Sequence, residues 1–439
     1  MAFWRQHNRR LRPGILVIWI ITLLGVTPPA RACGNLCEQI GVQSQNLVAG
    51  QTIWRMNGVQ FFLPQFGING KTLWDFNYAA AIDDGSLNYW LDKAQWLRAN
   101  TLRVFVDLPE VRSDGSIRTP TSYEAVYDLA ERAAARGMRL GLVLHNSADW
   151  RMTSERSAWI SGLLSYFQQR GVLPWIAYLS ADNEINNHCR NSSRDCFDGT
   201  EQHNAQRYID GAISWVAAFR AVAKAQAPQI LVTAGISTEM IDSDGTRAPL
   251  NFFRSATNGT RLVDLLDFLA PHNYSGGAAA VIADLRIGAG YTGAVVLEEY
   301  GFPTDPFPRN RLWSEGVFAC RLRPLASECT NTAPFFVARS IQSVASDGYA
   351  GSVAWTIADI REKNVSNACT RSDVPFDLWT GLFAIGGAYC DGGTFSRSAG
   401  QPKTTAILIC VAYGGSLLTC NDPVRPLYQT FLPGIERSR

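Results

Sequence analysis

Short apolar runs alternate with longer amphipathic runs along most of the chain, and this alternation predicts a parallel sheet covered by helices. The clearest helical spacing is found in residues 86–100 and 122–137, the second of which starts at a serine and ends at a glycine. Eight short apolar runs are predicted strands: residues 59–69, 101–108, 138–146, 174–184, 229–237, 263–274, 293–301 and 351–359.

The number of these units favours a closed α/β sheet, the (β/α)8 TIM barrel. Such barrels span about 200 to over 400 residues, which suits eight units within this chain. A doubly wound open sheet is the alternative, but it would usually carry a glycine-rich phosphate loop after its first strand. Residues 66–74, FGINGKTLW, do not match GxGxxG. Residues 381–415 then read as the last loop and helix of the barrel, and residues 33–58 as a cap over its bottom.

The first 32 residues are typical of an export signal. Four arginines precede an apolar run at residues 14–26, and small residues at Ala30 and Ala32 offer a cleavage site before Cys33. The run is shorter than the roughly 20 residues that a membrane span needs. We therefore expect a signal peptide at residues 1–32 and one catalytic domain at residues 33–439, with an uncleaved anchor as the alternative.

Cysteine content agrees with export to an extracellular or periplasmic compartment. All ten cysteines follow the proposed cleavage site, and an even number suits disulfides in an oxidising environment. Near neighbours in sequence would be paired, although sequence alone does not fix the connectivity. The expected pairs, which would staple loops of the barrel, are Cys33–Cys37, Cys189–Cys196, Cys320–Cys329, Cys369–Cys390 and Cys410–Cys420.

Charge and histidine content exclude several partners. The 40 basic and 38 acidic residues nearly cancel, so nothing calls for a nucleic acid or an anionic membrane. The five histidines form no HExxH pattern and no CxxC pair recurs. We expect no metal, no cofactor, no nucleic acid and no stable membrane insertion after the signal is removed, and a monomeric protein.

Polar residues gather where the predicted strands stop. In a TIM barrel the active site is built at the C-terminal ends of the strands, so these residues would converge on one mouth. A single such residue is usually structural, but charge at six strand ends is costly without a function. In strand order they are Arg103 on the second, His145 on the third, Asn183 and Glu184 on the fourth, His272 and Tyr274 on the sixth, Glu298 and Glu299 on the seventh, and Trp355 on the eighth.

This ordered set resembles the glycoside hydrolases of clan A, and most closely family 5, which contains cellulases and mannanases. The resemblance runs from about Trp54 to Tyr413. One departure is Ile185, because the family usually has proline after its acid/base glutamate. The resemblance implies a retaining β-glycoside hydrolase acting by double displacement on a β-mannan or β-glucan, with an oligosaccharide or polysaccharide as its partner.

The residues also support this chemistry directly. Glycoside hydrolysis needs one carboxyl that protonates the leaving oxygen and a second that attacks or stabilises the anomeric carbon. Glu184 and Glu299 lie three βα units apart in the sequence, which would place them across the barrel mouth. We assign Glu184 as acid/base and Glu299 as nucleophile. Glu298 is the rival for the second role, and Asp182 is expected to face away from the site because side chains alternate along a strand.

The remaining residues would serve these two acids or the sugar, in roles that resemble those of the family. Arg103 would keep Glu299 ionised. Tyr274 would donate a hydrogen bond to the same carboxylate. Asn183 would bind the sugar 2-hydroxyl, His145 and His272 would bind hydroxyls or orient the acids, and Trp355 would form an aromatic floor. Further aromatic residues could be sugar subsites or core: Trp74, Tyr78, Trp150 and Trp379.

Two other classes stay open from the sequence. A barrel that binds sugar without cleaving it would need one of the two carboxylates replaced, and both are present. An aldolase or metal-dependent hydrolase would need a lysine at a strand end or a set of metal ligands. Neither is found in the predicted strands.

Overall fold

The structure is a computed structural model of the chain. It describes residues 36–63, 86–111, 117–146, 149–186, 202–238, 254–255, 257–274, 277–288, 290–302, 333–358, 381–383 and 402–421. The predicted signal at residues 1–32 and seven of the ten cysteines lie outside these ranges, as do Trp74, Tyr78 and Trp379. Across the described ranges, no helix combines the length and the apolar character that crossing a membrane would require.

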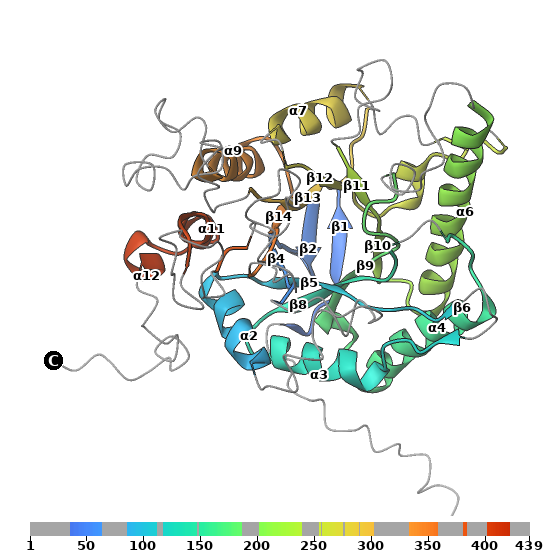
Figure 1. Cartoon of the computed structure of the whole chain (residues 1–439), viewed down its shortest axis with the longest axis horizontal. Helices are drawn as coiled ribbons and strands as arrows, with labels where there is room; N and C mark the ends of the chain where they lie inside the picture. The colour runs from blue at the N-terminus through green and yellow to red at the C-terminus, as the bar shows by residue number, and fades with distance from the viewer. Residues whose placement is uncertain are drawn as a thin grey trace, which may run out of the picture.

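The centre of the molecule is a parallel barrel, seen from one end in Figure 1. Its strands pair in the order β10-β9-β8-β5-β4-β14-β13-β12-β11. The two ends of this order, β10 and β11, are separated in sequence by Ala234 alone, so they are halves of one strand and close the barrel with eight strands. The bounds are β4 Met56–Gln60, β5 Thr101–Phe105, β8 Arg139–Val143, β9 Ile176–Ser180, β10 Leu231–Thr233, β11 Gly235–Ser237, β12 Ala270–His272, β13 Val296–Tyr300 and β14 Gly351–Ala354.

The predicted (β/α)8 barrel is confirmed. Seven strands fall inside their predicted runs, and the first begins at Met56, three residues before the predicted start. The polar Asn57 and the adjacent Gly58 conceal this start in the sequence. Gly58 has a steric reason, because a Cβ there would lie 2.6 Å from Val353 Cγ2 of the neighbouring β14. Close strand packing, rather than hydrophobicity, selects glycine at that position.

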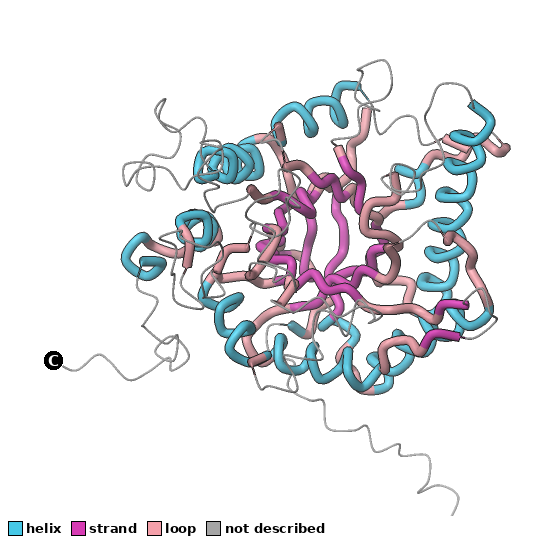
Figure 2. Tube along the Cα trace, viewed as in Figure 1, coloured by secondary structure: helices cyan, strands magenta, loops and turns pink. Residues whose placement is uncertain are grey.

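Helices form a ring around the barrel, as Figure 2 shows. Two of them begin at side-chain caps: Ser122 Oγ accepts from Ala125 N at 3.2 Å, and Thr153 Oγ1 accepts from Arg156 N at 3.3 Å. The apolar face predicted for residues 86–100 is buried against the core. The bounds are α2 Leu87–Trp96, α3 Tyr123–Ala134, α4 Ser154–Gln169, α6 Gln202–Gln226, α7 Ala278–Ala283, α9 Ala333–Ser346, α11 Thr404–Ala412 and α12 Leu417–Asn421, with short helical turns at Leu173–Trp175, Leu262–Leu265 and Asp284–Gly288.

A small antiparallel sheet closes the bottom of the barrel, as the sequence predicts for residues 33–58. Its strands are β1 Ile40–Gln43, β2 Asn46–Ala49 and β3 Thr52–Ile53. Ile40 and Leu47 are fully buried in one apolar cluster with residues from the N-terminal halves of the barrel strands, among them Phe268 and Val296. The cap excludes water from that end, so the C-terminal ends of the strands form the accessible mouth.

One expected disulfide is present in the described residues: Cys410 in α11 is bonded to Cys420 in α12. Cys37 is also disulfide-bonded, and none of the described cysteines is free. A second short hairpin, β6 Glu110–Val111 with β7 Ile117–Arg118, projects from the loop after β5.

Candidate active site

Arg103 is the hub of a buried polar cluster inside the barrel. It lies in the middle of β5, and its side chain is inaccessible to solvent. Nη1 donates to Glu299 Oε1 at 2.5 Å and to Gln60 Oε1 at 2.6 Å, while Nη2 donates to Asn183 Oδ1 at 2.7 Å. Nε lies 3.2 Å from Glu298 Oε1. One guanidinium therefore fixes four side chains from three other parts of the barrel: β4, the segment after β9, and β13.

Glu299 on β13 accepts bonds at both oxygens. Besides Arg103 on Oε1, Tyr274 donates its hydroxyl to Oε2 at 2.5 Å, and His272 Nδ1 lies 3.2 Å from the same oxygen. Burial raises the pKa of Glu299, but the charges of His272 and Arg103 and the bonds from His272 and Tyr274 lower it below its usual value. These neighbours thus favour the ionised form of the carboxyl.

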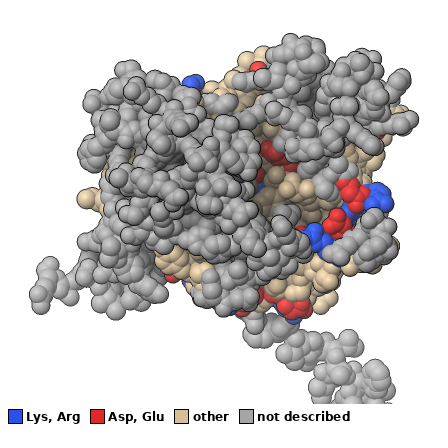
Figure 3. All heavy atoms as spheres, in the orientation of Figure 1, with Lys and Arg blue, Asp and Glu red and all other residues tan. Residues whose placement is uncertain are grey.

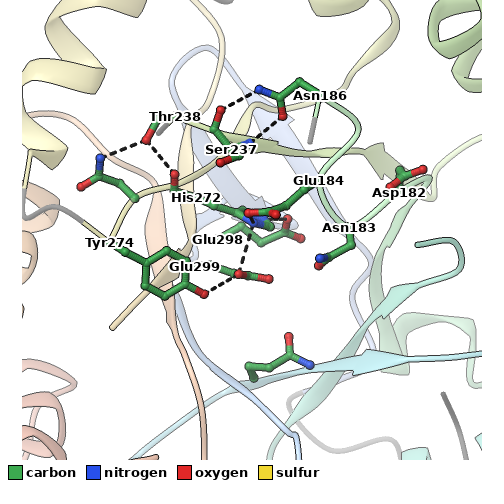
Figure 4. Close-up of polar contacts among 12 residues, drawn as sticks. Asp182, Asn183, Glu184, Asn186, Ser237, Thr238, His272, Tyr274, Glu298 and Glu299 are labelled. Atoms are coloured by element: carbon green, nitrogen blue, oxygen red, sulfur yellow. Dashed lines mark hydrogen bonds and ion pairs between the residues drawn. The ribbon is translucent and has the colours of Figure 1, made fainter. Parts of the chain in front are cut away.

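Glu184 is the more accessible acid. It follows β9, its side chain is 17% exposed against 4% for Glu299, and its Oε1 lies 3.2 Å from His272 Nδ1. One oxygen each of Glu184 and Glu299, together with a His272 nitrogen, all lie within 4.8 Å of one another. The close-up in Figure 4 shows these side chains facing each other from three separate elements. Proton exchange with a ligand or with water is therefore open to Glu184 more than to Glu299.

Glu298 is not exposed to the mouth, although it is adjacent to Glu299. Regular alternation would point it out of the barrel, but β13 shifts register between Leu297 and Tyr300, so both acids contact Arg103 and His272. Glu298 is fully buried. Burial raises its pKa, and the neighbouring Arg103 and His272 lower it below the usual value. Glu298 is therefore enclosed by protein, whereas the side chain of Glu299 keeps a small exposed fraction.

His145 and Asp182 form a second pair at the mouth. Asp182 Oδ2 is 2.8 Å from His145 Nδ1 and accepts from Trp150 Nε1 at 3.1 Å. Figure 4 shows Asp182 apart from Glu184 and turned away from it, as alternation predicts. Its position suits a role in orienting His145 and Trp150. Trp150 thereby joins the site, whereas the sequence left it open between a sugar subsite and core.

Trp355 directly follows β14 and forms an apolar wall beside the acids. It is 8% exposed and packs on Phe62, with ring centroids 5.9 Å apart. Phe105 and Val143 belong to the same cluster, and Tyr274 packs against it. This patch adjoins the charged group through Tyr274, so an apolar surface and two carboxyls meet in one place.

The opening above the acids is visible in the space-filling view. Figure 3 shows acidic side chains inside a hollow on this face, with further charged residues along one rim. Of the nine strand-end residues singled out from the sequence, seven form one bonded cluster: Arg103, Asn183, Glu184, His272, Tyr274, Glu298 and Glu299. Trp355 lies beside this cluster through Tyr274, and His145 is paired with Asp182.

Gln60 and Asn186 are contributors that sequence reasoning missed. Gln60 ends β4 and accepts from Arg103; its position as the last polar residue before an apolar run was the available signal. Asn186 anchors the segment after Glu184, because its side chain donates to Ser237 O at 2.7 Å and accepts from Ser237 N at 2.8 Å. Asn186 resembles any loop asparagine in the sequence, so nothing there marks this role.

The distances within Glu184, His272 and Glu299 would also allow a metal ion. The donors fit one poorly. Burial lowers the pKa of His272, but the charge of Glu299 and hydrogen bonds with Glu184, Glu298 and Glu299 raise it well above its usual value. The ring is then an imidazolium, which has no lone pair to offer a cation. The cluster is better described as a set of hydrogen-bonded carboxylates around one cationic ring.

Comparison with known proteins supports the fold. An exo-β-1,4-mannosidase from Opitutaceae bacterium strain TAV5 superposes with a TM-score of 0.52 at 14% identity, covering 84% of this chain and 61% of that one. A β-glucuronidase from Bacteroides uniformis gives 0.51 at 14% identity, covering 79% of this chain and 35% of that one. The chain therefore shares the barrel fold of these two enzymes. The resemblance drawn from the strand-end motifs is thereby confirmed at the level of the fold.

A β-1,4-D-mannanase from Cryptopygus antarcticus is also similar, with a TM-score of 0.49 at 18% identity over 73% of this chain and 88% of that one. No family model matches the sequence, and no curated protein matches it either.

Proposed function

We propose that this chain is a secreted, retaining β-glycoside hydrolase that cleaves a β-linked glycan of the mannan or glucan type. The observation that carries the proposal is the approach of one oxygen of Glu184 to one of Glu299 within 4.8 Å. Retaining enzymes hold their carboxyls about 5–5.5 Å apart, and inverting enzymes about 6.5–9.5 Å apart to admit a water. The short separation supports attack by a carboxylate rather than by water.

The contacts of each acid give it a role in a double displacement. In the first half, Glu299 forms a bond to the anomeric carbon while the bond to the leaving oxygen breaks, and that oxygen takes the proton of Glu184. In the second half, Glu184 removes a proton from water as the water displaces Glu299. The ionised, enclosed state of Glu299 and the greater exposure of Glu184 favour this division of roles.

Asn183 and Trp355 would hold the sugar. The Asn183 oxygen is occupied by Arg103, which turns the amide nitrogen toward other acceptors such as a sugar 2-hydroxyl. That contact strengthens in the oxocarbenium-like transition state. Trp355 and its apolar neighbours supply a surface for the ring face of the sugar.

A manno-configured substrate is the first to test, because the exo-β-1,4-mannosidase is among the similar structures above a TM-score of 0.5. Export follows from the predicted signal at residues 1–32 and agrees with the disulfides of Cys37 and Cys410. The protein should be incubated with β-mannans, β-glucans and their oligosaccharides, following product size and anomeric configuration by proton NMR. We expect initial products that retain the β-configuration; initial α-products would refute a retaining mechanism.

Substitutions of the two acids test the roles separately. Glu184→Ala should cleave only substrates with a good leaving group and should form a β-glycosyl azide when azide is added. Glu299→Ala with azide should give the α-glycosyl azide, because azide then attacks in place of the nucleophile. The matched control is Glu131→Ala on the exposed face of α3, which should keep full activity. Full turnover in either acid variant would contradict the assignment.

A further inference from the structure

We propose that Glu298 is a positioning residue: it holds His272 as an imidazolium whose Nδ1–H bridges the two reacting carboxyls. The bridging role rests on the function proposed above for Glu184 and Glu299, but the charge state of His272 can be measured without any substrate. Glu298 is fully buried, so it acts through its neighbours and not on the sugar.

The geometry places a carboxylate at each nitrogen of the ring. His272 Nε2 is 3.1 Å from Glu298 Oε2, and Nδ1 is 3.2 Å from both Glu184 Oε1 and Glu299 Oε2. A neutral imidazole has one N–H and one lone pair, so one of its nitrogens would face an ionised carboxylate with a lone pair. Only the imidazolium donates at both nitrogens. Glu298, which contacts Nε2 and not the nitrogen that faces the two reacting carboxyls, therefore favours the protonated ring.

The groups that face the His272 ring are carboxyls, which stabilise a positive charge on it. Glu184 faces it from the segment after β9, while Glu298 and Glu299 face it from β13. The hydroxyl of Tyr178 on β9 interacts with Glu298. The nearest cation in the cluster is Arg103, which is paired with the same two acids of β13. The ring is backed by Gly235 of β11, where a Cβ would lie 2.6 Å from Nε2. A side chain at position 235 would therefore collide with the ring nitrogen that faces Glu298.

The charges balance only when Glu298 is counted. In the proposed mechanism Arg103 and His272 carry two positive charges, Glu298 and Glu299 carry two negative ones, and Glu184, as the general acid, enters the reaction protonated. In the first step Glu184 gives up that proton and gains one negative charge, while Glu299 becomes an uncharged ester and loses one. The net charge of the five side chains therefore stays at zero. Without the charge of Glu298, a protonated His272 would leave the site with a surplus positive charge, so the neutral form of His272 would be favoured instead.

The direct test is the protonation state of His272. Nitrogen NMR of the ¹⁵N-histidine-labelled protein distinguishes an imidazolium from the two neutral tautomers, and the chain has only five histidines. The His272 signals are assigned by their loss in His272→Asn. In the wild-type protein we expect His272 to stay an imidazolium well above pH 6.5, where an ordinary histidine titrates. A neutral His272 in the wild-type protein at that pH would overturn the proposal.

Two substitutions of Glu298 separate charge from shape. Glu298→Gln keeps the size and removes the charge, so His272 should deprotonate at lower pH than in the wild type. Glu298→Asp keeps the charge and should keep the imidazolium over most of that range. The matched control is Asp182→Asn, which removes the other buried carboxylate bonded to a histidine; it should change the signals of His145 and leave those of His272 in place.

Kinetics supply the second readout. Misplacing a reacting group can lower the rate about 10²-fold, so we expect kcat of Glu298→Gln to fall by up to about that factor with little change in KM. The alkaline limb of its pH–kcat profile should move to lower pH. Glu298→Asp should recover part of the loss. An unchanged His272 titration in Glu298→Gln would overturn the proposal even if activity were lost. A shifted titration in a chain that cleaves no glycoside would support the role of Glu298 at His272 and refute the proposed function instead.

Discussion

The hydroxyl of Tyr274 offers the sharpest single-atom test of the site. It donates to Glu299 Oε2 at 2.5 Å, and Tyr274→Phe removes that oxygen while leaving the ring against Trp355 and its neighbours. A hydrogen bond to a charged group is worth about 1.5–3 kcal/mol. At about 1.4 kcal/mol per factor of ten, the full bond corresponds to a rate factor of roughly ten to 150.

The bond should matter most in the second half of the reaction. Glu299 is an uncharged ester in the covalent intermediate and regains its negative charge as water displaces it, so the Tyr274 bond strengthens as that step proceeds. We therefore expect Tyr274→Phe to slow deglycosylation by up to the factor just given and to lower KM as the intermediate accumulates. Losing the bond also raises the pKa of Glu299, which moves the acid limb of kcat/KM to higher pH.

The assay is a stopped-flow burst with a dinitrophenyl β-glycoside of the accepted sugar, followed by intact-protein mass spectrometry. A burst and a glycosylated protein should appear in Tyr274→Phe. Tyr127→Phe is the matched control, because it removes a tyrosine bond to a glutamate, Glu131, at 3.2 Å on the exposed face of α3. It should leave the kinetics unchanged. A Tyr274→Phe enzyme with wild-type kcat, no accumulated intermediate and an unmoved acid limb would refute the reasoning.

Two further predictions concern stability. The Cys410–Cys420 bond closes a loop with a sequence separation of 10. Replacing both cysteines by alanine should therefore lower the free energy of unfolding by about 3 kcal/mol in the chain-entropy model. Urea titration would measure this change, and an unchanged midpoint would contradict the prediction. The lowered pKa of Glu298 and Glu299 adds stability above their unfolded value of about 4.3, and this is lost as pH falls through the folded values. The raised pKa of His272 adds stability below about 6.5, and this is lost as pH rises through its folded value. Urea midpoints across pH should therefore pass through a maximum, and a Glu299→Gln variant that lost stability in acid as steeply as the wild type would contradict the assignment.

The barrel could be read from the sequence because its strands are buried on both faces and its helices on one. That contrast produces continuous apolar runs such as residues 138–146, next to helical spacing such as residues 122–137. Strand limits are set by something else. Ala234 divides the fifth strand into β10 and β11, and Met56 begins the first, through pairing and close packing that no periodicity records.

The site could be predicted as a set of positions but not as a network. Strand-end placement found Glu184 and Glu299 because the fold gathers those ends, whereas Arg103, also expected at a strand end, lies in the middle of β5. The partners of each residue depend on register and on local irregularity. The shift in β13 turns Glu298 inward beside Glu299, where strict alternation would have turned one of the two away. A bulge has no signature in this sequence, so the role of Glu298 could emerge only from the structure.

The burial of these charges also explains why one acid, and not another, can exchange protons during the reaction. A buried charge is costly unless it is paired, and breaking a buried pair leaves its partner exposed to that cost. Protonating Glu298 or Glu299 would leave Arg103 or His272 with too little negative charge around it. Glu184 contacts the same ring from the more solvent-accessible side, so its proton can leave and return while water and substrate share the change in charge. This contrast supports the proposed acid/base role of Glu184, because the other two carboxylates are held ionised by the cations they neutralise.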